Sequence, residues 1–501
     1  MRRKIKTLSY FLLFAAIFLI IRAHSFNMPF ERDEGGYAYV AHFLSKGLVP
    51  YKDSFDQKPP LIYLIYYISD LIGYRMLWVP RAIAAVFALT ASFMLYFIGK
   101  KEFSPNAGKK AMWFFLAFLT IPAITPYSAN TEIFMLTPLV GAFLIYIYWK
   151  NKKSYWPWYW FSVLSSLAIM FKPICIPTIA YIFTIWFFSS VPDKNKLSSI
   201  FKKFLISIAG FLTVLLPILL WLSITNSLKK FFEIVVLYNF SYSKISNINL
   251  VIILLILITA ISAFKYIKLK GKSLFWFYSG ILASSFLFIY QSPIFHYYLL
   301  TIPFISLAIA YSLEKLSSFS KSSLFNSAIF LVGLLMIVLP NAKSIFASKE
   351  QLVTLTYDKS NPFLESVIVG EELNKHSSPN DLVLMAGHEP QVLYYADRKS
   401  ASRFIYLYTL LIPSTKRAEY ENKYINDIEN KNPKFVIYSP LITQKGHCGY
   451  ISESLIKYLD NTIKNKYQIL GGYVNGSNQG WKENLNDDDI KQSSFIIYIR
   501  K

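Results

Sequence analysis

Carboxylates are rare in the apolar part of this sequence, and four of them lie where apolar runs begin or end. Glu31, Asp33 and Glu34 follow the first apolar run, and Glu132 immediately precedes another. Charged side chains next to lipid are costly, so they often mark functional sites. A carboxylate held beside a hydroxyl can take its proton as the oxygen attacks an electrophile. These residues therefore favour general-base chemistry at one face of a membrane, with Asp33 as the leading candidate.

Candidate cations occur in the same part of the chain. Lys58 precedes two prolines, and Arg81 lies at the start of an apolar run. Lys172 lies between two apolar runs, and His296 precedes a further one. Cationic groups stabilise the charge that develops on a phosphate leaving group. Carboxylates and cations together are what the transfer of a sugar from a lipid phosphate to a hydroxyl requires.

Each of these residues also has a simpler interpretation. Asp33 can cap the helix that follows it, favoured by the helix dipole. Lys58, Arg81 and Lys172 can extend their charged ends to lipid headgroups. His296 stands beside two tyrosines and can belong to an aromatic belt at the membrane surface. The functional and structural interpretations of these five residues stay open at this point.

The hydropathy pattern defines the elements that would position these side chains. The chain is 54% hydrophobic and its mean hydropathy is +0.37, whereas soluble domains are typically about 45–50% apolar. The excess fills Leu8–Pro340, in segments of the length that crosses a bilayer. We predict about eleven spans: Leu8–Ala23, Val79–Gly99, Ala111–Tyr127, Ile133–Trp149, Trp156–Phe171, Ile174–Val191, Phe204–Ile224, Leu250–Ala263, Leu274–Tyr290, Tyr297–Leu313 and Leu324–Pro340.

The net charge of +23 indicates how the chain is oriented in the membrane and does not indicate nucleic-acid binding. The surplus of Lys and Arg lies almost entirely in residues 1–340, and residues 341–501 are nearly balanced. No basic stripe interleaved with aromatics appears in the polar part, which argues against nucleic acid as a partner. Basic residues concentrate on one set of loops, which the positive-inside rule places in the cytoplasm. We predict a cytoplasmic N-terminus, a C-terminal domain on the far side, and the plasma (inner) membrane as the location.

Two parts of the chain are expected outside the bilayer. The first long outer loop covers residues 24–78, and its segments Tyr37–Leu44 and Pro60–Ile72 are expected to be helices in the interface plane. Residues 1–340 would form the membrane domain and residues 341–501 a second domain. In the latter, alternating strands and helices predict a small extracytoplasmic α/β domain. Its expected strands are Leu382–Met385, Phe435–Tyr438, Tyr467–Leu470 and Phe495–Ile499, and its expected helices are Leu364–Asn374, Gln391–Ala396 and Ala418–Asn430.

The first outer loop resembles that of the GT-C glycosyltransferases. The resemblance rests on Arg32–Tyr37, which reads RDEGGY, and on Asp56–Leu61, which reads DQKPPL. The most similar branches are the protein O-mannosyltransferases and the bacterial transferases that add 4-amino-4-deoxy-L-arabinose to lipid A. Weaker matches occur at Asn130-Thr131-Glu132, at His296-Tyr297 and at Tyr394–Arg398. Together these motifs touch most of the chain.

The resemblance implies a GT-C-like multi-pass α-helical membrane protein. Its reaction would be an inverting transfer of a monosaccharide, a hexose or a pentose, from a polyprenyl-phosphate carrier to an acceptor hydroxyl. By analogy Asp33 is the general base, and Glu34 and Glu132 shape the acceptor site. Lys58 and Arg81 would face the donor phosphate. The implied partners are a polyprenyl-phosphate sugar, a lipid, glycan or protein acceptor, and the lipid bilayer.

Two positions depart from the family pattern. The residue two after the Asp-Glu pair is often Arg or His in relatives, and here it is Gly36. The residue before Lys-Pro-Pro is often Glu, and here it is Gln57. If relatives bind a metal through that Glu, this chain has lost the ligand. A divalent metal is therefore possible, but nothing in the sequence indicates one, and we assign no cofactor.

Other functions compete with this hypothesis. A polysaccharide polymerase or ligase also has many spans and a large outer loop, but usually lacks a C-terminal α/β domain. A transporter would place paired charges deep in its spans and show two matching halves, and neither feature is evident. A receptor with a ligand-binding ectodomain is the remaining alternative, since Gly387-His388-Glu389 follows an expected strand and precedes an expected helix.

Overall fold

The computed structural model describes residues 2–189, 196–239, 250–291, 294–319, 322–411, 416–443, 451–476 and 479–501. The chain forms two compact units. We call the first the helical unit: Met1–Met28, Trp78–Leu220 and Ile245–Tyr357. We call the second the loop–sheet unit: Pro29–Leu77, Trp221–Lys244 and Asp358–Lys501. The hydropathy boundary at residue 340 divides apolar from polar sequence, whereas the compact units group most of the first outer loop with the C-terminal residues.

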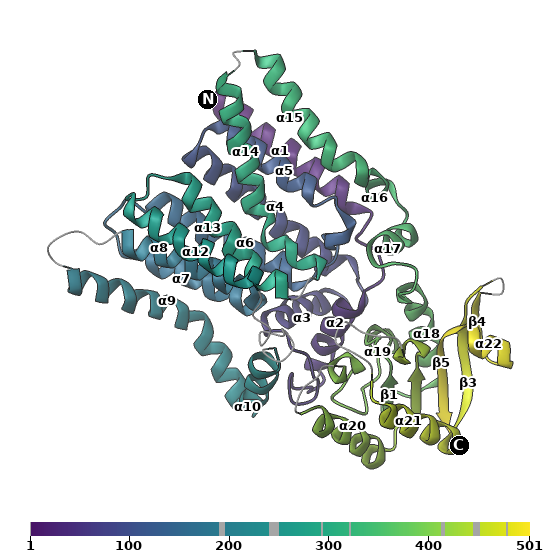
Figure 1. Cartoon of the computed structure of the whole chain (residues 1–501). Helices are drawn as coiled ribbons and strands as arrows, with labels where there is room; N and C mark the ends of the chain where they lie inside the picture. Colours follow the sequence, from purple (N-terminus) through teal and green to yellow (C-terminus); the bar gives the residue numbers. More distant parts are fainter. Residues whose placement is uncertain are drawn as a thin grey trace. The chain divides into compact units, whose positions relative to one another are not determined.

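The helical unit consists of helices and short 3₁₀ segments (Figure 1). Its helices are α1 Arg2–Ala23, α4 Trp78–Glu102, α5 Pro105–Phe118, α6 Thr131–Trp149, α7 Trp156–Phe171, α8 Ile176–Ser189, α9 Lys196–Ile224, α12 Leu250–Lys268, α13 Leu274–Gln291, α14 Ile302–Phe319, α15 Ser323–Val338, α16 Ala342–Phe346 and α17 Lys349–Tyr357. The 3₁₀ segments are η1 Pro122–Ile124, η2 Pro173–Cys175, η4 Phe295–Leu300 and η5 Leu339–Asn341. Helix α6 packs against both α4 and α7.

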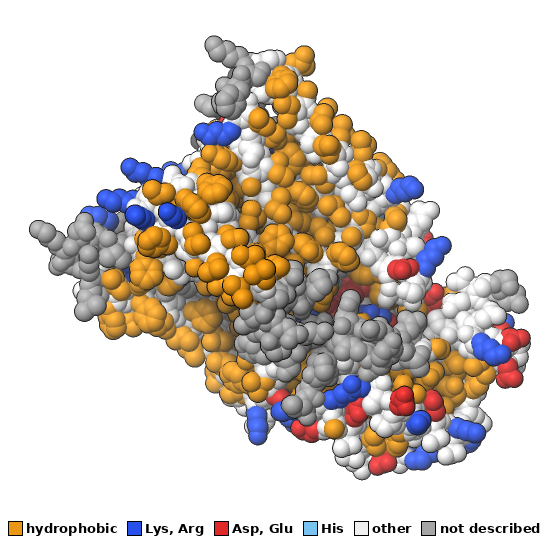
Figure 2. Space-filling model, in the orientation of Figure 1, with side chains coloured by type: hydrophobic (Ala, Val, Ile, Leu, Met, Phe, Trp, Pro, Cys, Tyr) orange, Lys and Arg blue, Asp and Glu red, His pale blue; other side chains and the backbone are white. Residues whose placement is uncertain are grey.

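Several helices have the length and composition of membrane spans. Within the described residues, five are long and apolar enough: Trp78–Glu102, Thr131–Trp149, Ser198–Ile224, Leu250–Lys268 and Ser323–Phe346. The span in α6 is 78% buried, whereas none of the span in α15 is. Hydrophobic side chains cover the visible face of α9 and α15 (Figure 2). These exposed apolar surfaces indicate contact with lipid in a multi-pass membrane protein; the number of about eleven spans stays a prediction.

Proline shifts two helix boundaries away from those predicted. The expected span Ala111–Tyr127 is interrupted, because α5 ends at Phe118 and a 3₁₀ turn begins at Pro122. The expected span Tyr297–Leu313 starts with the 3₁₀ segment η4, and α14 begins only at Ile302. Proline lacks the N–H that continues a helix and is favoured in a first turn.

Ion pairs show which helix ends of the helical unit lie side by side. Lys150 at the end of α6 pairs at 2.9 Å with Glu102 at the end of α4. Lys110 near the start of α5 pairs at 3.7 Å with Glu314 in the last part of α14. The ends of α4 and α6 therefore lie on one side. Two of the predicted site residues, Arg81 and Glu132, lie at the opposite ends of α4 and α6.

The loop–sheet unit combines two helices of the first outer loop with a mixed sheet (Figure 1). Its helices are α2 Arg32–Leu44, α3 Leu61–Ile72, α10 Leu228–Phe231, α18 Phe363–His376, α19 Gln391–Ala396, α20 Arg417–Lys431, α21 Glu453–Lys466 and α22 Asp487–Gln492, with a π-helix η3 Phe232–Tyr238 and 3₁₀ segments η6 Leu407–Leu410 and η7 Pro440–Thr443. The strands are β1 Val383–Ala386, β2 Phe435–Tyr438, β3 Tyr467–Val474, β4 Gly480–Lys482 and β5 Ser493–Arg500.

The sheet has the order β1-β2-β5-β3-β4. Strands β1 and β2 are parallel, with Val383 opposite Phe435, and the other neighbours are antiparallel. All four expected strands are present within a few residues of their predicted bounds, as are the three expected helices. Strand β4 and helices α21 and α22 were not predicted.

Helix α2 of the first outer loop packs closely on α19 of the C-terminal residues. At Gly35 an added Cβ would lie 2.3 Å from the Cβ of Gln391, far inside van der Waals contact. Glycine at this position lets the two helices approach, whereas at Gly36 the nearest atom would be 3.7 Å away. This packing fixes the start of α2, which carries Asp33 and Glu34.

Candidate active site

The start of α2 is capped by Glu31. Its carboxylate accepts hydrogen bonds from the backbone N–H groups of Asp33 (3.0 Å) and Glu34 (3.1 Å), and the Glu34 carboxylate accepts one from the backbone of Glu31. This is a capping box. The interpretation of Asp33 as the cap is therefore wrong, because Glu31 does that work. The side chain of Asp33 instead pairs with a lysine.

Asp33 forms an ion pair with Lys58. The ammonium nitrogen of Lys58 lies 3.3 Å from a carboxylate oxygen of Asp33 and 3.6 Å from one of Asp56. The side chains of Lys58 and Asp56 are only 6% and 2% exposed, whereas that of Asp33 is 28% exposed. We call Asp33, Asp56 and Lys58 the carboxylate–lysine cluster. Its one solvent-accessible carboxylate is that of Asp33.

The loop between α2 and α3 is shaped to present Lys58. The hydroxyl of Tyr51 donates a hydrogen bond to the backbone carbonyl of Lys58 (2.8 Å), and the ammonium lies 5.4 Å from the centre of the Tyr37 ring. The backbone N–H of Phe55 donates to the carbonyl of Arg403. These contacts orient Lys58 inward, so the interpretation that it extends to lipid headgroups does not apply to this structure.

The charges of this region are strongly perturbed. Burial lowers the pKa of Lys58, but the carboxylates of Asp33 and Asp56 outweigh it and hold the pKa well above the usual value. Burial, followed by repulsion from Asp33 and Glu34, raises the pKa of Glu31 to about 8. Lys58 therefore stays cationic at neutral pH. Perturbed groups of this kind gather at functional sites.

Two members of this site escaped the sequence analysis. Asp56 was not among the predicted site residues, and neither was Tyr406, whose hydroxyl donates to the Asp56 carboxylate at 3.2 Å. The signal for Asp56 was its place two residues before Lys58, in the motif itself. No local signal points to Tyr406, which lies 350 residues away in the sequence.

In the helical unit, three other predicted residues come together. The carboxylate of Glu132 lies 2.9 Å from the ammonium of Lys172 and 3.6 Å from Nε2 of His296. The ammonium of Lys172 also lies 4.8 Å from the centre of the Tyr297 ring. Lys172 leaves helix α7 in an extended conformation because Pro173 follows it. We call Glu132, Lys172 and His296 the glutamate–lysine cluster.

Arg81 contacts the segment that follows α1. Its guanidinium is fully buried and donates hydrogen bonds to the carbonyls of Ser25, Phe26 and Met28, just after α1. These bonds hold the chain that leaves α1. A role at a donor phosphate stays a prediction for Arg81, as do the assigned roles of the other predicted residues.

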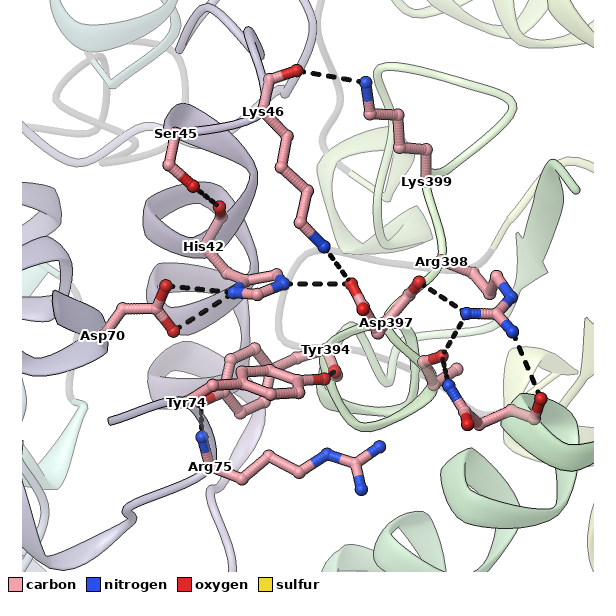
Figure 3. A network of polar contacts seen from close by, with 12 residues as sticks. His42, Ser45, Lys46, Asp70, Tyr74, Arg75, Tyr394, Asp397, Arg398 and Lys399 are labelled. Carbon is pink, nitrogen blue, oxygen red and sulfur yellow. Dashed lines mark hydrogen bonds and ion pairs between the residues drawn. The ribbon is translucent and has the colours of Figure 1, made fainter. Parts of the chain in front are cut away.

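A second charged network lies within the loop–sheet unit (Figure 3). The ring of His42 is placed between two carboxylates, with Nδ1 3.0 Å from Asp70 and Nε2 2.9 Å from Asp397. Lys46 also reaches Asp397, at 2.5 Å, and Tyr74 stacks on the imidazole with ring centres 4.3 Å apart. The network links α2 and α3 to the residue that ends α19. It holds together α2 and α3, the two helices that flank the loop carrying Asp56 and Lys58.

A metal site was left open by the sequence. Across the described residues no three side chains of His, Cys, Asp or Glu gather in a way that would hold an ion. In the carboxylate–lysine cluster the position between the two carboxylates is occupied by an ammonium group. The positive charge beside the two carboxylates is thus supplied by the side chain of Lys58.

The fold is similar to that of two solved structures of ArnT from Cupriavidus metallidurans. With ArnT bound to undecaprenyl phosphate the TM-score is 0.59 at 11% sequence identity, and 98% of each chain is covered. With ArnT in the apo state the TM-score is 0.58 at 12% identity, again covering 98% of each chain. The chain has the GT-C fold. The predicted resemblance is thus confirmed at the level of the fold.

Comparisons of the sequence with protein-family models and with curated proteins give no match. A further structural match is the archaeal oligosaccharyltransferase AglB from Archaeoglobus fulgidus, in complex with an inhibitory peptide and a dolichol-phosphate. There the TM-score is 0.48 at 14% identity, over 100% of this chain and 76% of that one.

Proposed function

We propose that this protein is an inverting glycosyltransferase that moves a monosaccharide from a polyprenyl-phosphate carrier to an acceptor hydroxyl. One observation carries the proposal. In a chain with the GT-C fold, Asp33 is the accessible carboxylate of a buried cluster centred on Lys58. The ArnT structure with the same fold is bound to undecaprenyl phosphate, which supports a lipid-linked donor.

The reaction is a single displacement at the anomeric carbon of the sugar. The acceptor oxygen forms a bond to that carbon as the bond from the carbon to the phosphate oxygen breaks. The proton of the acceptor hydroxyl passes to the carboxylate of Asp33. The electron pair of the broken bond stays on the polyprenyl phosphate, whose negative charge Lys58 stabilises. One displacement from the opposite face inverts the anomeric configuration.

The remaining residues have proposed roles in binding. Asp56 positions the Lys58 ammonium, and Tyr406 in turn holds the Asp56 carboxylate through its hydroxyl. Glu34 and Glu132 shape the acceptor site, with Lys172 and His296 fixing the charge and orientation of Glu132. Arg81 is proposed as a further donor contact. The protein lies in the plasma (inner) membrane, with its N-terminus in the cytoplasm and the C-terminal sheet on the far side.

The proposal is tested with purified protein in lipid nanodiscs. Radiolabelled polyprenyl-phosphate hexoses and pentoses are supplied together with an extract of membranes and cell wall. We expect label in a product and an equal amount of free polyprenyl phosphate, with the anomeric configuration inverted. Transfer from nucleotide sugars alone would contradict the lipid-linked donor. Movement of intact donor across the membrane without bond cleavage would identify a transporter instead.

A further inference from the structure

Arg22 is a buried cation in the last turn of α1. Its side chain belongs to a residue that is 1% exposed. Among the side chains and backbone groups that the structure describes, none accepts a hydrogen bond from its Nε, Nη1 or Nη2 atoms. The ion pairs found in the same residues likewise include no carboxylate beside Arg22.

The surroundings of Arg22 offset its charge only in part. The guanidinium carbon lies 5.9 Å from the centre of the Phe18 ring and 5.8 Å from that of the Tyr127 ring. Cation–π contacts of this kind are weak compared with the cost of burying an unpaired charge. The positive charge of Arg81 acts on the same group and adds repulsion.

Arg81 provides an internal comparison. Both arginines are buried in the helical unit, and both lie next to the segment that leaves α1. Arg81 is satisfied by the carbonyls of Ser25, Phe26 and Met28. Arg22 has a guanidinium of the same shape with no such acceptors. The difference indicates that Arg22 is arranged for an acceptor that the chain itself does not supply.

The position of Arg22 along α1 indicates where that acceptor comes from. Helix α1 has 22 residues, which span about 33 Å at 1.5 Å per residue. The hydrocarbon core of a bilayer is about 30 Å thick. Leu8, Leu12 and Ile20 are 59%, 62% and 73% exposed, as expected for a helix in contact with lipid. If α1 crosses the bilayer from its first residue, Arg22 would lie near the depth of the headgroups, where phosphate is the abundant anion.

We propose that Arg22 binds the phosphate group of a membrane lipid, at a site in the helical unit that is distinct from the carboxylate–lysine cluster. The planar guanidinium can donate two parallel hydrogen bonds to phosphate oxygens. Tyr127 and Phe18 form the aromatic walls. The phosphate comes either from a phospholipid, as a diester, or from a polyprenyl phosphate, as a monoester.

The site is tested on the full-length protein, delipidated in a neutral detergent. Phosphatidylglycerol, undecaprenyl phosphate and, as a lipid without phosphate, diacylglycerol are added separately. Bound lipid is counted by native mass spectrometry, and the melting temperature is measured at each lipid concentration. Wild type is compared with Arg22→Met and Arg22→Lys. Lys150→Met is the control, since it removes a largely buried cation of the helical unit whose acceptor, Glu102, is in the chain.

The wild type should bind at least one of the two phosphate lipids and melt at a higher temperature when it does. Arg22→Met should bind that lipid at least about tenfold more weakly, the loss expected for charge-assisted hydrogen bonds. Without lipid, Arg22→Met should be at least as stable as wild type, whereas Lys150→Met should be less stable because Glu102 loses its partner. The lipid whose binding depends on Arg22 identifies the source of the phosphate.

Equal lipid binding and equal melting shifts in wild type and Arg22→Met would overturn the proposal. So would a wild type that neither phosphate lipid binds or stabilises. If Arg22→Met fails to fold, Arg22→Lys decides the question, because it keeps the charge but loses the paired geometry. Its lipid-induced shift should be clearly smaller than that of wild type, and an unchanged shift would contradict the site.

Discussion

The ammonium of Lys58 lies 3.3 Å from the carboxylate of Asp33 and 3.6 Å from that of Asp56, so one buried cation serves two acids. The pair of carboxylates would repel each other without it. The arrangement explains why a lysine is stable at a nearly inaccessible position. It also means that a phosphate approaching Lys58 would meet a cation already oriented by protein.

Removal of Lys58 should cost both stability and donor binding. In Lys58→Met the two carboxylates lose their shared partner, which should lower the free energy of unfolding by about 3–5 kcal/mol. The double variant Lys58→Met/Asp56→Asn should recover part of that loss while transfer stays low. Chemical denaturation and the KM for the donor are the measurements. Lys52→Met, at an exposed position in the same loop, should change neither. Wild-type donor affinity in Lys58→Met would remove the lysine from the donor site.

The close approach at Gly35 should tolerate no side chain. In Gly35→Ala the new Cβ would lie 2.3 Å from the Cβ of Gln391, and the resulting shift of α2 should cost about 1–3 kcal/mol. Gly36→Ala is the matched control, because its nearest neighbour would be 3.7 Å away. Thermal melting compares the two variants. Equal melting temperatures would show that α2 and α19 are not packed as described.

The His42 network should stabilise the loop–sheet unit in a pH-dependent way. Burial lowers the pKa of His42, but Asp397 and Asp70 outweigh it and raise the pKa above the usual value, although Lys46 opposes them. The stability that the proton contributes is therefore fully present below the unfolded pKa of about 6.5. It is lost as the pH rises through the folded pKa.

His42→Gln should accordingly be most destabilising in mild acid. We expect a loss of about 1–3 kcal/mol near pH 5.5, the range for hydrogen bonds to charged groups, and a smaller loss near pH 9.5. The pKa of Asp397 is lowered to about 2: burial raises it, but His42 and Lys46 outweigh that effect. Its contribution is present above its unfolded pKa and fades only in strong acid. His376→Gln, at a more exposed histidine, is the control. A penalty independent of pH would contradict the charged network.

The glutamate–lysine cluster can be separated from simple structural support by a matched pair of variants. Glu132→Gln and Glu102→Gln each remove the carboxylate of an ion pair that measures 2.9 Å, with Lys172 and Lys150 respectively. Both variants should lower stability, because each leaves a largely buried lysine unpaired. Only Glu132→Gln should also lower kcat/KM, by about tenfold or more. Equal transfer by the two variants would assign Glu132 a structural role.

Site residues that lie in a strong local pattern can be predicted from the sequence. Site residues whose role depends on contacts with distant parts of the chain cannot. Asp33 and Lys58 were identified because the loop motif contains both, and Lys172 because it interrupts an apolar run. Tyr406 and Asp397 belong to networks with partners 350 and 355 residues away. No periodicity or local spacing carries that information. The same holds for the capping of α2, where three acidic residues compete and only the packed structure selects Glu31.

The predicted C-terminal secondary structure shows the same division. The buried strand Phe435–Tyr438 matches β2 residue for residue, because a continuous apolar run defines it. The run Asp487–Asp489 was not predicted to be helical, yet it forms the first turn of α22, capped by Asn486. Acidic residues are favourable at a helix start. The polar composition of α22 made it hard to recognise as a helix, and its signal in the sequence was the capping residue Asn486.

The central claim is that Asp33 takes the proton of the acceptor hydroxyl. The most direct measurement is the rate of transfer from a radiolabelled polyprenyl-phosphate sugar by wild type, by Asp33→Asn and by the exposed control Asp53→Asn, with donor binding measured in parallel. We predict a loss on the order of 10²–10⁴-fold in Asp33→Asn alone, with donor binding retained. Transfer by Asp33→Asn at the wild-type rate would contradict the account.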